Sequence, residues 1–276
     1  MPVQEDTLTY KRRSMSSSLN FHSSFHLQKY LSGKQRLSLA KTRTVQDEAD
    51  DILNAPGRVL IPPAIRSQLQ NIQQTGSATL GGNTFTPSLA ILASINKMLY
   101  YSLHHNSAAN PAFAILSYLR PGSRHHSNGT AVDLAIVDGR AIVVSNQQAC
   151  LQAIVAAINN LAPGNYALGL PRPPRTDASG AATDAARYRY LRLYDTSTTP
   201  PQLLPQYANL PQTHYFLGAQ FNERYVPGGI TGGLAQINNA TARAQLTTAI
   251  ANARAQGANV LHLMADALDH LHIQQI

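Results

Sequence analysis

The stretch from Ser117 to Asp133, SYLRPGSRHHSNGTAVD, constrains the fold of this chain more than any other. Its turn of small residues is followed by TAVDLAI (130–136), a pattern that predicts a loop running into a strand. Alternate residues of a strand share a face, so Ala131 and Asp133 lie on the same side. The loop can fold His126 back over that face. An imidazole and a carboxylate then converge, which supplies two of the three protein ligands of a catalytic zinc site.

A second cluster of ionisable residues lies near the end of the chain, from Asp266 to Ile273 (DALDHLHI). As a strand, this segment places His270 and His272 on one face. Asp269 lies three residues before His272 and faces the opposite side from His270. The two clusters together offer three protein ligands and leave a fourth zinc position open for water, as a zinc hydrolase requires.

One family carries this combination of residues. The pattern H-x-x-G-x-A-x-D, formed by His126, Gly129, Ala131 and Asp133, with His272 in a late H-x-H, resembles the zinc peptidases that cut peptidoglycan peptides. These are the D-alanyl-D-alanine carboxypeptidases and dipeptidases, the penicillin-insensitive murein endopeptidases, and the fold group that also holds lysostaphin and the hedgehog signalling domain. The resemblance implies a Zn²⁺ cofactor bound by His126, Asp133 and His272.

The resemblance also implies roles for three further residues. Members with an E-x-x-H pair suggest Asp269 as the acid or base, whereas the H-x-H murein endopeptidases suggest His270. His270 is favoured because it shares the strand face of His272, and Asp269 stays the alternative. Arg120 matches the Tyr-Arg segment that precedes the histidine in dipeptidases, and its planar donor fork suits an oxyanion or a substrate carboxylate.

The chain departs from the family pattern at one point. Many members carry Ser-x-His with the serine two residues before the ligand histidine, and here Ser123 stands two residues before His125. The spacings to Gly129 and Asp133 favour His126, so His125 is the alternative ligand. The motif-bearing part spans about residues 85–276.

Charge and cysteine content limit the possible domain organisation, partners and disulfides of the chain. The chain carries a net charge of +8, and residues 1–45 hold eight Lys or Arg and only two acids, so most of the excess lies in a Ser-rich head. We expect a flexible head followed by one domain over residues 46–276. A basic chain could bind nucleic acid, but no nucleic-acid motif is present and none is expected as a partner. The single cysteine, Cys150, excludes an intrachain disulfide.

The elements predicted from periodicity and capping define the fold class. Long helices are expected at Ser88–His105, Gln147–Leu161 and Asn239–Gln256, with strands at Phe113–Leu119, Thr130–Ile136, Tyr166–Leu170, Asn259–Met264 and Asp269–Ile273. Gly76–Pro87 is expected to be a loop. Helices alternating with short, hairpin-linked strands predict an α+β fold with a small, mostly antiparallel central sheet, flanking helices and the zinc site on the sheet.

The function expected from these features is zinc-dependent hydrolysis of amide bonds in peptidoglycan peptides, by an endopeptidase or a carboxypeptidase. No apolar run approaches the about 20 residues of a membrane span, and the N-terminus has no apolar signal core. We therefore expect synthesis in the cytoplasm and action in the periplasm or cell wall after secretion or injection, as an antibacterial effector or a lysin. A secretion apparatus or an immunity protein would then be a partner. The alternative is a catalytically inactive zinc-fold module that binds cell wall or a protein.

Overall fold

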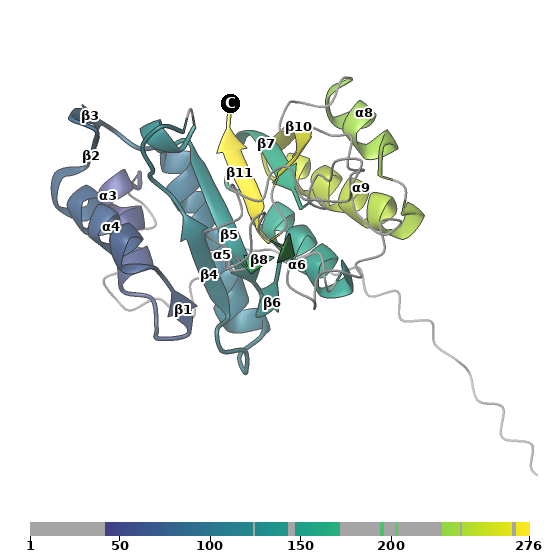
Figure 1. Cartoon of the computed structure of the whole chain (residues 1–276), viewed down its shortest axis with the longest axis horizontal. Coiled ribbons are helices and arrows are strands. Elements are labelled where there is room, and N and C mark those ends of the chain that lie inside the picture. Colours follow the sequence, from purple (N-terminus) through teal and green to yellow (C-terminus); the bar gives the residue numbers. More distant parts are fainter. Residues whose placement is uncertain are drawn as a thin grey trace, which may run out of the picture. The chain divides into compact units, whose positions relative to one another are not determined.

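An open, twisted sheet forms the centre of the computed structural model (Figure 1). Its strands lie in the order β1 (Val59–Leu60), β4 (Phe113–Ser117), β5 (Ala131–Val137), β11 (Leu271–Gln275), β7 (Gly164–Leu170) and β10 (Ala258–Ala265), and β6 (Arg140–Ala141) pairs with β5. The pairs β1–β4 and β7–β10 are parallel, and the other four pairs of this sheet are antiparallel. This arrangement confirms the predicted α+β class with a mostly antiparallel sheet.

The structure describes residues 42–123, 125–142, 147–171, 194–195, 202–203, 228–237, 239–266 and 269–276. The predicted basic head, residues 1–45, lies outside the described residues except for its last four. A short hairpin of β8 (Tyr194–Asp195) and β9 (Gln202–Leu203) is separate from the central sheet. Within the described ranges, no helix combines the length and the hydropathy that a membrane span requires.

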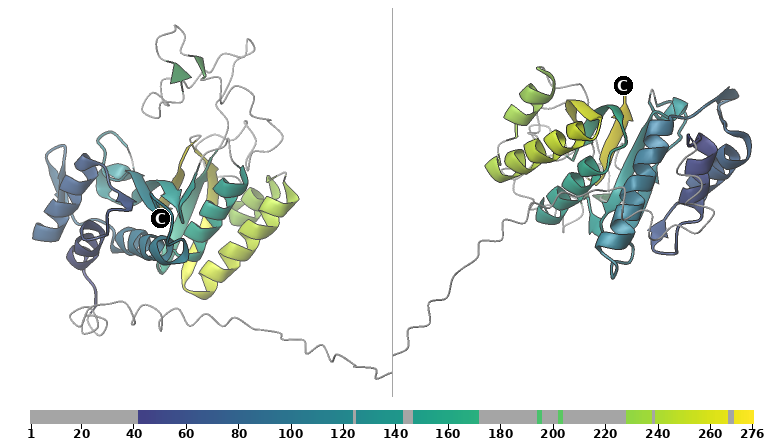
Figure 2. Two further views of the ribbon diagram at one scale, coloured as in Figure 1. Left: turned by 90° about the horizontal axis from the view of Figure 1, so that it is seen from below. Right: turned by 180° about the vertical axis from the view of Figure 1, so that it is seen from behind.

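Helices cover one face of the central sheet (Figure 2). Among the helices that pack against its strands are α5 (Leu89–His105), α6 (Gln147–Asn159) and α9 (Ala240–Ala255). Beside them, α3 (Val45–Leu53) packs on α4 (Pro63–Thr75) and on α5, while α8 (Gly229–Ala235) packs on β10. The flanking helices predicted from the sequence are therefore confirmed.

Local capping interactions explain where these helices begin. Ser88 accepts a hydrogen bond from the backbone N–H of Ile91 at 3.1 Å, which starts α5. Thr44 and Asp47 form a reciprocal capping box at the start of α3, so two backbone donors that the helix leaves free are satisfied. Pro63 occupies the first position of α4, where the missing N–H of proline costs nothing.

A tight turn at Asp138-Gly139 joins β5 to β6. Both residues have positive φ, 55° at Asp138 and 70° at Gly139, and Val137 pairs with Arg140 across the turn. A Cβ at Gly139 would lie 2.3 Å from the Cβ of Ala109. Glycine is therefore required at this position on both conformational and steric grounds.

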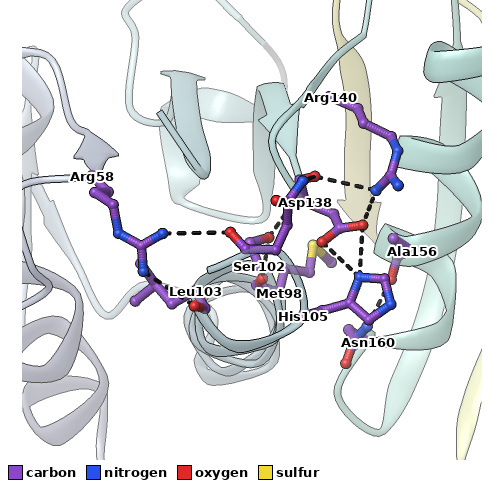
Figure 3. Close-up of polar contacts among 10 residues, drawn as sticks. Arg58, Met98, Ser102, Leu103, His105, Asp138, Arg140, Ala156 and Asn160 are labelled. Atoms are coloured by element: carbon purple, nitrogen blue, oxygen red, sulfur yellow. Dashed lines mark hydrogen bonds and ion pairs between the residues drawn. The ribbon is translucent and has the colours of Figure 1, made fainter. Parts of the chain in front are cut away.

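The same turn is fixed to the end of α5 by a polar network around the buried Asp138 (Figure 3). The carboxylate of Asp138, almost fully buried, contacts His105 Nδ1 at 2.9 Å and forms an ion pair with Arg140. Its backbone N–H donates to Ser102 Oγ at 2.8 Å, and Asn106 donates to its carbonyl at 3.1 Å. One aspartate thus connects the sheet to the helix that covers it.

We expect Asp138→Ala to lower the free energy of unfolding by about 1–3 kcal/mol. The change removes the carboxylate that His105 and Arg140 contact, and alanine is also poorly suited to positive φ. Asp138→Asn should cost less, because asparagine tolerates the left-handed conformation and can still accept a hydrogen bond. Urea unfolding curves of the two variants measure the difference. Equal losses for alanine and asparagine would contradict this account of the turn.

Candidate metal centre

Strand β11 brings the two predicted ligand clusters together. It lies between β5 and β7, and its register pairs His272 with Asp133 on one side and with Gly169 on the other. His272 Nδ1 and Asp133 Oδ1 are 2.8 Å apart, and both side chains are buried. Two residues separated by 139 positions are thereby cross-strand neighbours.

His126 reaches the same place from the turn that precedes β5. It lies in the short 3-10 turn η1 (His126–Asn128), which Gly129 ends with a φ of 70°. Thr130 then donates two hydrogen bonds to the carbonyl of His125, which directs the chain into the strand. A Cβ at Gly129 would lie 3.0 Å from the Cβ of Pro87, so the glycine of the sequence pattern serves both the turn and its packing.

The tautomer of His126 is fixed by its surroundings. Its Nδ1 lies 2.7 Å from the carbonyl oxygen of Tyr118, which can only accept, so Nδ1 carries the hydrogen. Nε2 of the neutral ring is then a lone-pair donor, and it lies 3.3 Å from Asp133 Oδ1. A backbone acceptor on one ring nitrogen and a free lone pair on the other is the usual arrangement of a metal-binding histidine.

These three side chains fit a zinc ion by distance and by donor chemistry. One ligand atom each from His126, Asp133 and His272 lies within 4.8 Å of the others. Two ligands about 2.0–2.1 Å from a tetrahedral zinc would be about 3.3–3.4 Å apart. The separation of 3.3 Å between His126 Nε2 and Asp133 Oδ1 matches this value, whereas His272 Nδ1 and Asp133 Oδ1 are closer, at 2.8 Å. Two buried atoms of the group, His126 Nε2 and Asp133 Oδ2, have no hydrogen-bond partner among the described residues. An ion bound here would satisfy both.

Arg120 and His270 lie beside this group, as the sequence predicted for residues next to the metal. Arg120 Nη1 is 3.7 Å from Asp133 Oδ2, and its side chain is about half exposed at 52%. His270 Nε2 is 3.7 Å from Asp133 Oδ1, and this side chain is buried. The structure therefore places a half-exposed guanidinium and a buried imidazole beside the carboxylate of Asp133.

The strand that carries His272 starts later than expected. β11 begins at Leu271, so Asp269 and His270 precede it rather than forming part of it. The predicted start of the strand at Asp269 was therefore wrong, although His270 and His272 both approach Asp133 Oδ1, at 3.7 Å and 2.8 Å. Pairing starts only at Leu271, opposite Leu134. His270 still reaches the group, and Asp269 does not enter either set of potential ligands among the described residues.

Asp266 belongs to the site and was given no role from the sequence. Its carboxylate lies 3.8 Å from His270 Nε2 and 3.7 Å from His272 Nδ1. With Asp133 and His270 it forms a second set of side chains that could hold a metal ion. The available signal was its position in the acidic and histidine-rich segment, four residues before His270.

The electrostatics of the group favour a cation. Burial alone would raise the pKa of Asp133, but the neighbouring imidazoles of His270, His126 and His272 outweigh it and hold the pKa well below its usual value. Burial likewise works to lower the pKa of His270, yet the carboxylates of Asp133, Asp266 and Asp269 raise it well above its ordinary value. A buried carboxylate that stays ionised needs compensating positive charge, which a proton or a metal ion can supply.

The backbone of β7 allows no side chain beside these ligands. A Cβ at Gly169 would lie 2.8 Å from the Cβ of His272 and 2.9 Å from the Cβ of Asp266. Glycine at this position lets β7 approach β11 closely enough for His272 to face Asp133. The close approach gives Gly169 a role in the site although it contributes no chemistry.

Gly169→Ala should weaken zinc binding about 10-fold or more, because the added methyl displaces His272, and misplaced ligand geometry costs affinity on that scale. Competition against a chromophoric chelator measures the zinc dissociation constant. Gly57→Ala is the matched control, since a Cβ there meets nothing within 4 Å. A folded Gly169→Ala protein with unchanged zinc affinity would show that His272 does not depend on this approach.

Comparison with known proteins finds no matching family model, no matching curated protein and no matching solved structure. The likeness to the zinc peptidases of peptidoglycan therefore depends on the motif residues quoted from the sequence, and the function is argued below from the geometry of the site.

Proposed function

We propose that this chain is a zinc-dependent peptidase that hydrolyses amide bonds in peptidoglycan peptides. The observation that carries the proposal is the buried convergence of His126, Asp133 and His272 within 4.8 Å, with unpartnered donor atoms at its centre. Three protein ligands with room for water are typical of catalytic rather than structural zinc sites, which close the fourth position with a further protein ligand.

Zinc held there would lower the pKa of a bound water to about 7 and polarise the scissile carbonyl. The residues of the chain supply the rest. His126 and His272 offer ring nitrogens, and Asp133 offers a carboxylate that stays ionised in the buried site. The positive charge of a bound ion would offset the carboxylates that raise the pKa of His270. His270 Nε2 would then accept the proton of the attacking water and return it to the leaving amine.

Arg120 would serve the substrate rather than the metal. Its half-exposed guanidinium lies 3.7 Å from Asp133 Oδ2, so it faces both the ligand group and the solvent. A planar fork of N–H donors in this position can stabilise an oxyanion or bind a substrate carboxylate. The first role suits an endopeptidase, and the second suits a carboxypeptidase.

The setting of this activity is part of the proposal. A peptidoglycan peptide as substrate places the action of the protein in the periplasm or cell wall, reached by secretion or injection, with a secretion apparatus or an immunity protein as a partner. This setting follows from the substrate, and it is tested only together with the substrate.

The proposal is tested by incubating the full chain with purified peptidoglycan, with and without a chelator, and identifying the fragments by mass spectrometry. We expect cleaved stem peptides or crosslinks in the untreated sample, loss of cleavage with chelator, and recovery when zinc is restored. Zinc binding without any cleaved peptide would favour the inactive zinc-fold binding module instead. Cleavage that persists after complete metal removal would contradict the mechanism.

A further inference from the structure

The two residues predicted as alternative bases contact each other directly. Asp269 Oδ1 lies 3.1 Å from His270 Nδ1, and the two side chains are 13% and 9% exposed. A carboxylate can only accept, so the hydrogen of this bond belongs to Nδ1. In the neutral ring the lone pair is then on Nε2.

The other ring nitrogen of His270 faces the ligand group without being bonded to it. Nε2 lies 3.7 Å from Asp133 Oδ1 and 3.8 Å from Asp266 Oδ1, both longer than a hydrogen bond. The Asp269 carboxylate, by contrast, is not part of either set of potential metal ligands among the described residues. The geometry thus orders the three parts as carboxylate, imidazole and metal-ligand group.

We propose that Asp269 is a positioning residue for His270, so that the two act in series rather than as alternatives. Asp269 holds the Nδ1–H tautomer and keeps Nε2 directed at the ligand group. Nδ1 keeps its hydrogen bond to Asp269 while Nε2 acts at the ligand group. The catalytic consequence rests on the proposed peptidase function, whereas the tautomer of His270 does not.

Asparagine at position 269 keeps the volume of the aspartate side chain but changes the hydrogen bond that it makes with His270. It therefore tests whether Asp269 positions His270 or only fills space. Its amide can donate a hydrogen bond to Nδ1, which favours the tautomer with the hydrogen on Nε2 and removes the lone pair from the site. The same change in the aspartate of a Ser-His-Asp triad lowers turnover about 10⁴-fold with the geometry intact. We therefore expect Asp269→Asn to lower kcat by about 10²–10⁴-fold, with KM and zinc content unchanged.

A double-mutant cycle tests whether Asp269 acts through His270. Using stem peptides released from purified peptidoglycan as the probe, kcat is measured for the wild-type chain, Asp269→Asn, His270→Ala and the double variant. We expect Asp269→Asn to cause no further loss in the His270→Ala background, because residues that act as a unit are non-additive. Equal losses in both backgrounds would overturn the proposal. Asp51→Asn in α3 is the control for removal of a carboxylate elsewhere.

A spectroscopic measurement keeps the proposal testable if no peptide is cleaved. Long-range ¹H–¹⁵N spectra of histidine-labelled full-length protein, at a pH where the ring is neutral, report which nitrogen carries the hydrogen. The His270 signal is identified by its loss in His270→Ala. We expect the hydrogen on Nδ1 in the wild-type chain and on Nε2 in Asp269→Asn. The expected tautomers without peptide cleavage would leave the positioning intact and refute the peptidase.

Two results would overturn the positioning itself. The first is a wild-type His270 with its hydrogen on Nε2. The second is two zinc ions per chain, falling to one in Asp266→Asn. In that case the set formed by Asp133, Asp266 and His270 binds a metal, and Nε2 is a ligand rather than a proton acceptor.

Discussion

We expect the purified chain to bind one zinc ion, and alanine in place of His126, Asp133 or His272 to remove it. Each of the three supplies a donor atom within 4.8 Å of the other two. Loss of a residue that only orients a metal ligand costs about 10–100-fold in affinity, so loss of a ligand itself should exceed that range. Elemental analysis after dialysis, together with a zinc competition titration, measures both occupancy and affinity.

His125→Ala is the matched control for this series. The residue is adjacent to His126 and has the same chemistry, but among the described residues the potential ligand sets contain His126 only. We expect the control to keep its zinc. If His125→Ala loses zinc and His126→Ala keeps it, the ligand has been assigned to the wrong histidine. Circular dichroism spectra establish that each variant is folded before its zinc content is compared.

His270→Ala should keep zinc and lose about 10²–10⁴-fold in turnover, the usual contribution of a positioned acid or base. The expectation rests on the place of Nε2, which is 3.7 Å from Asp133 Oδ1 but outside the set formed by His126, Asp133 and His272. Steady-state kinetics on peptidoglycan stem peptides, paired with zinc analysis of the same sample, measure both quantities.

A different pattern of activity loss between the His270 and Asp269 variants would assign the base to the other residue. If His270→Ala stays fully active while Asp269→Asn is inactive with its zinc retained, the aspartate is the base. That result would require Asp269 to leave His270, which it contacts at 3.1 Å, and to reach the ligand group. Loss of zinc in His270→Ala would instead make this histidine a ligand.

Short-range spacing explains why part of the site could be predicted from the sequence. His126, Gly129 and Asp133 lie within one turn-and-strand unit, so their relative positions depend on local geometry that residue types reveal. The meeting of Asp133 with His272 depends on β11 pairing with β5, and spacing within each cluster does not specify that register. The resemblance to the zinc peptidase motif predicted that Asp133 and His272 would meet. Asp266 had no such pattern to identify it.

The fold follows the same division between local and long-range information. Helices with strong apolar periodicity and caps, such as α5, were predicted within a few residues. The segment 76–87 was expected to be a loop but contains a hairpin of β2 (Ala78–Leu80) and β3 (Asn83–Phe85). Its strands have only three residues each, and half of their side chains are polar and exposed, so the Gly81-Gly82 turn was its main signal. The parallel pairs likewise join segments distant in the chain.

Zinc-edge anomalous diffraction from crystals of the zinc-loaded chain tests the central claim most directly. We predict one anomalous peak, about 2.0–2.1 Å from His126 Nε2, an oxygen of Asp133 and His272 Nδ1, with His270 Nε2 outside the coordination sphere. The absence of a peak at these residues, or a peak bound by His125 or centred between Asp266 and His270, would contradict the assignment.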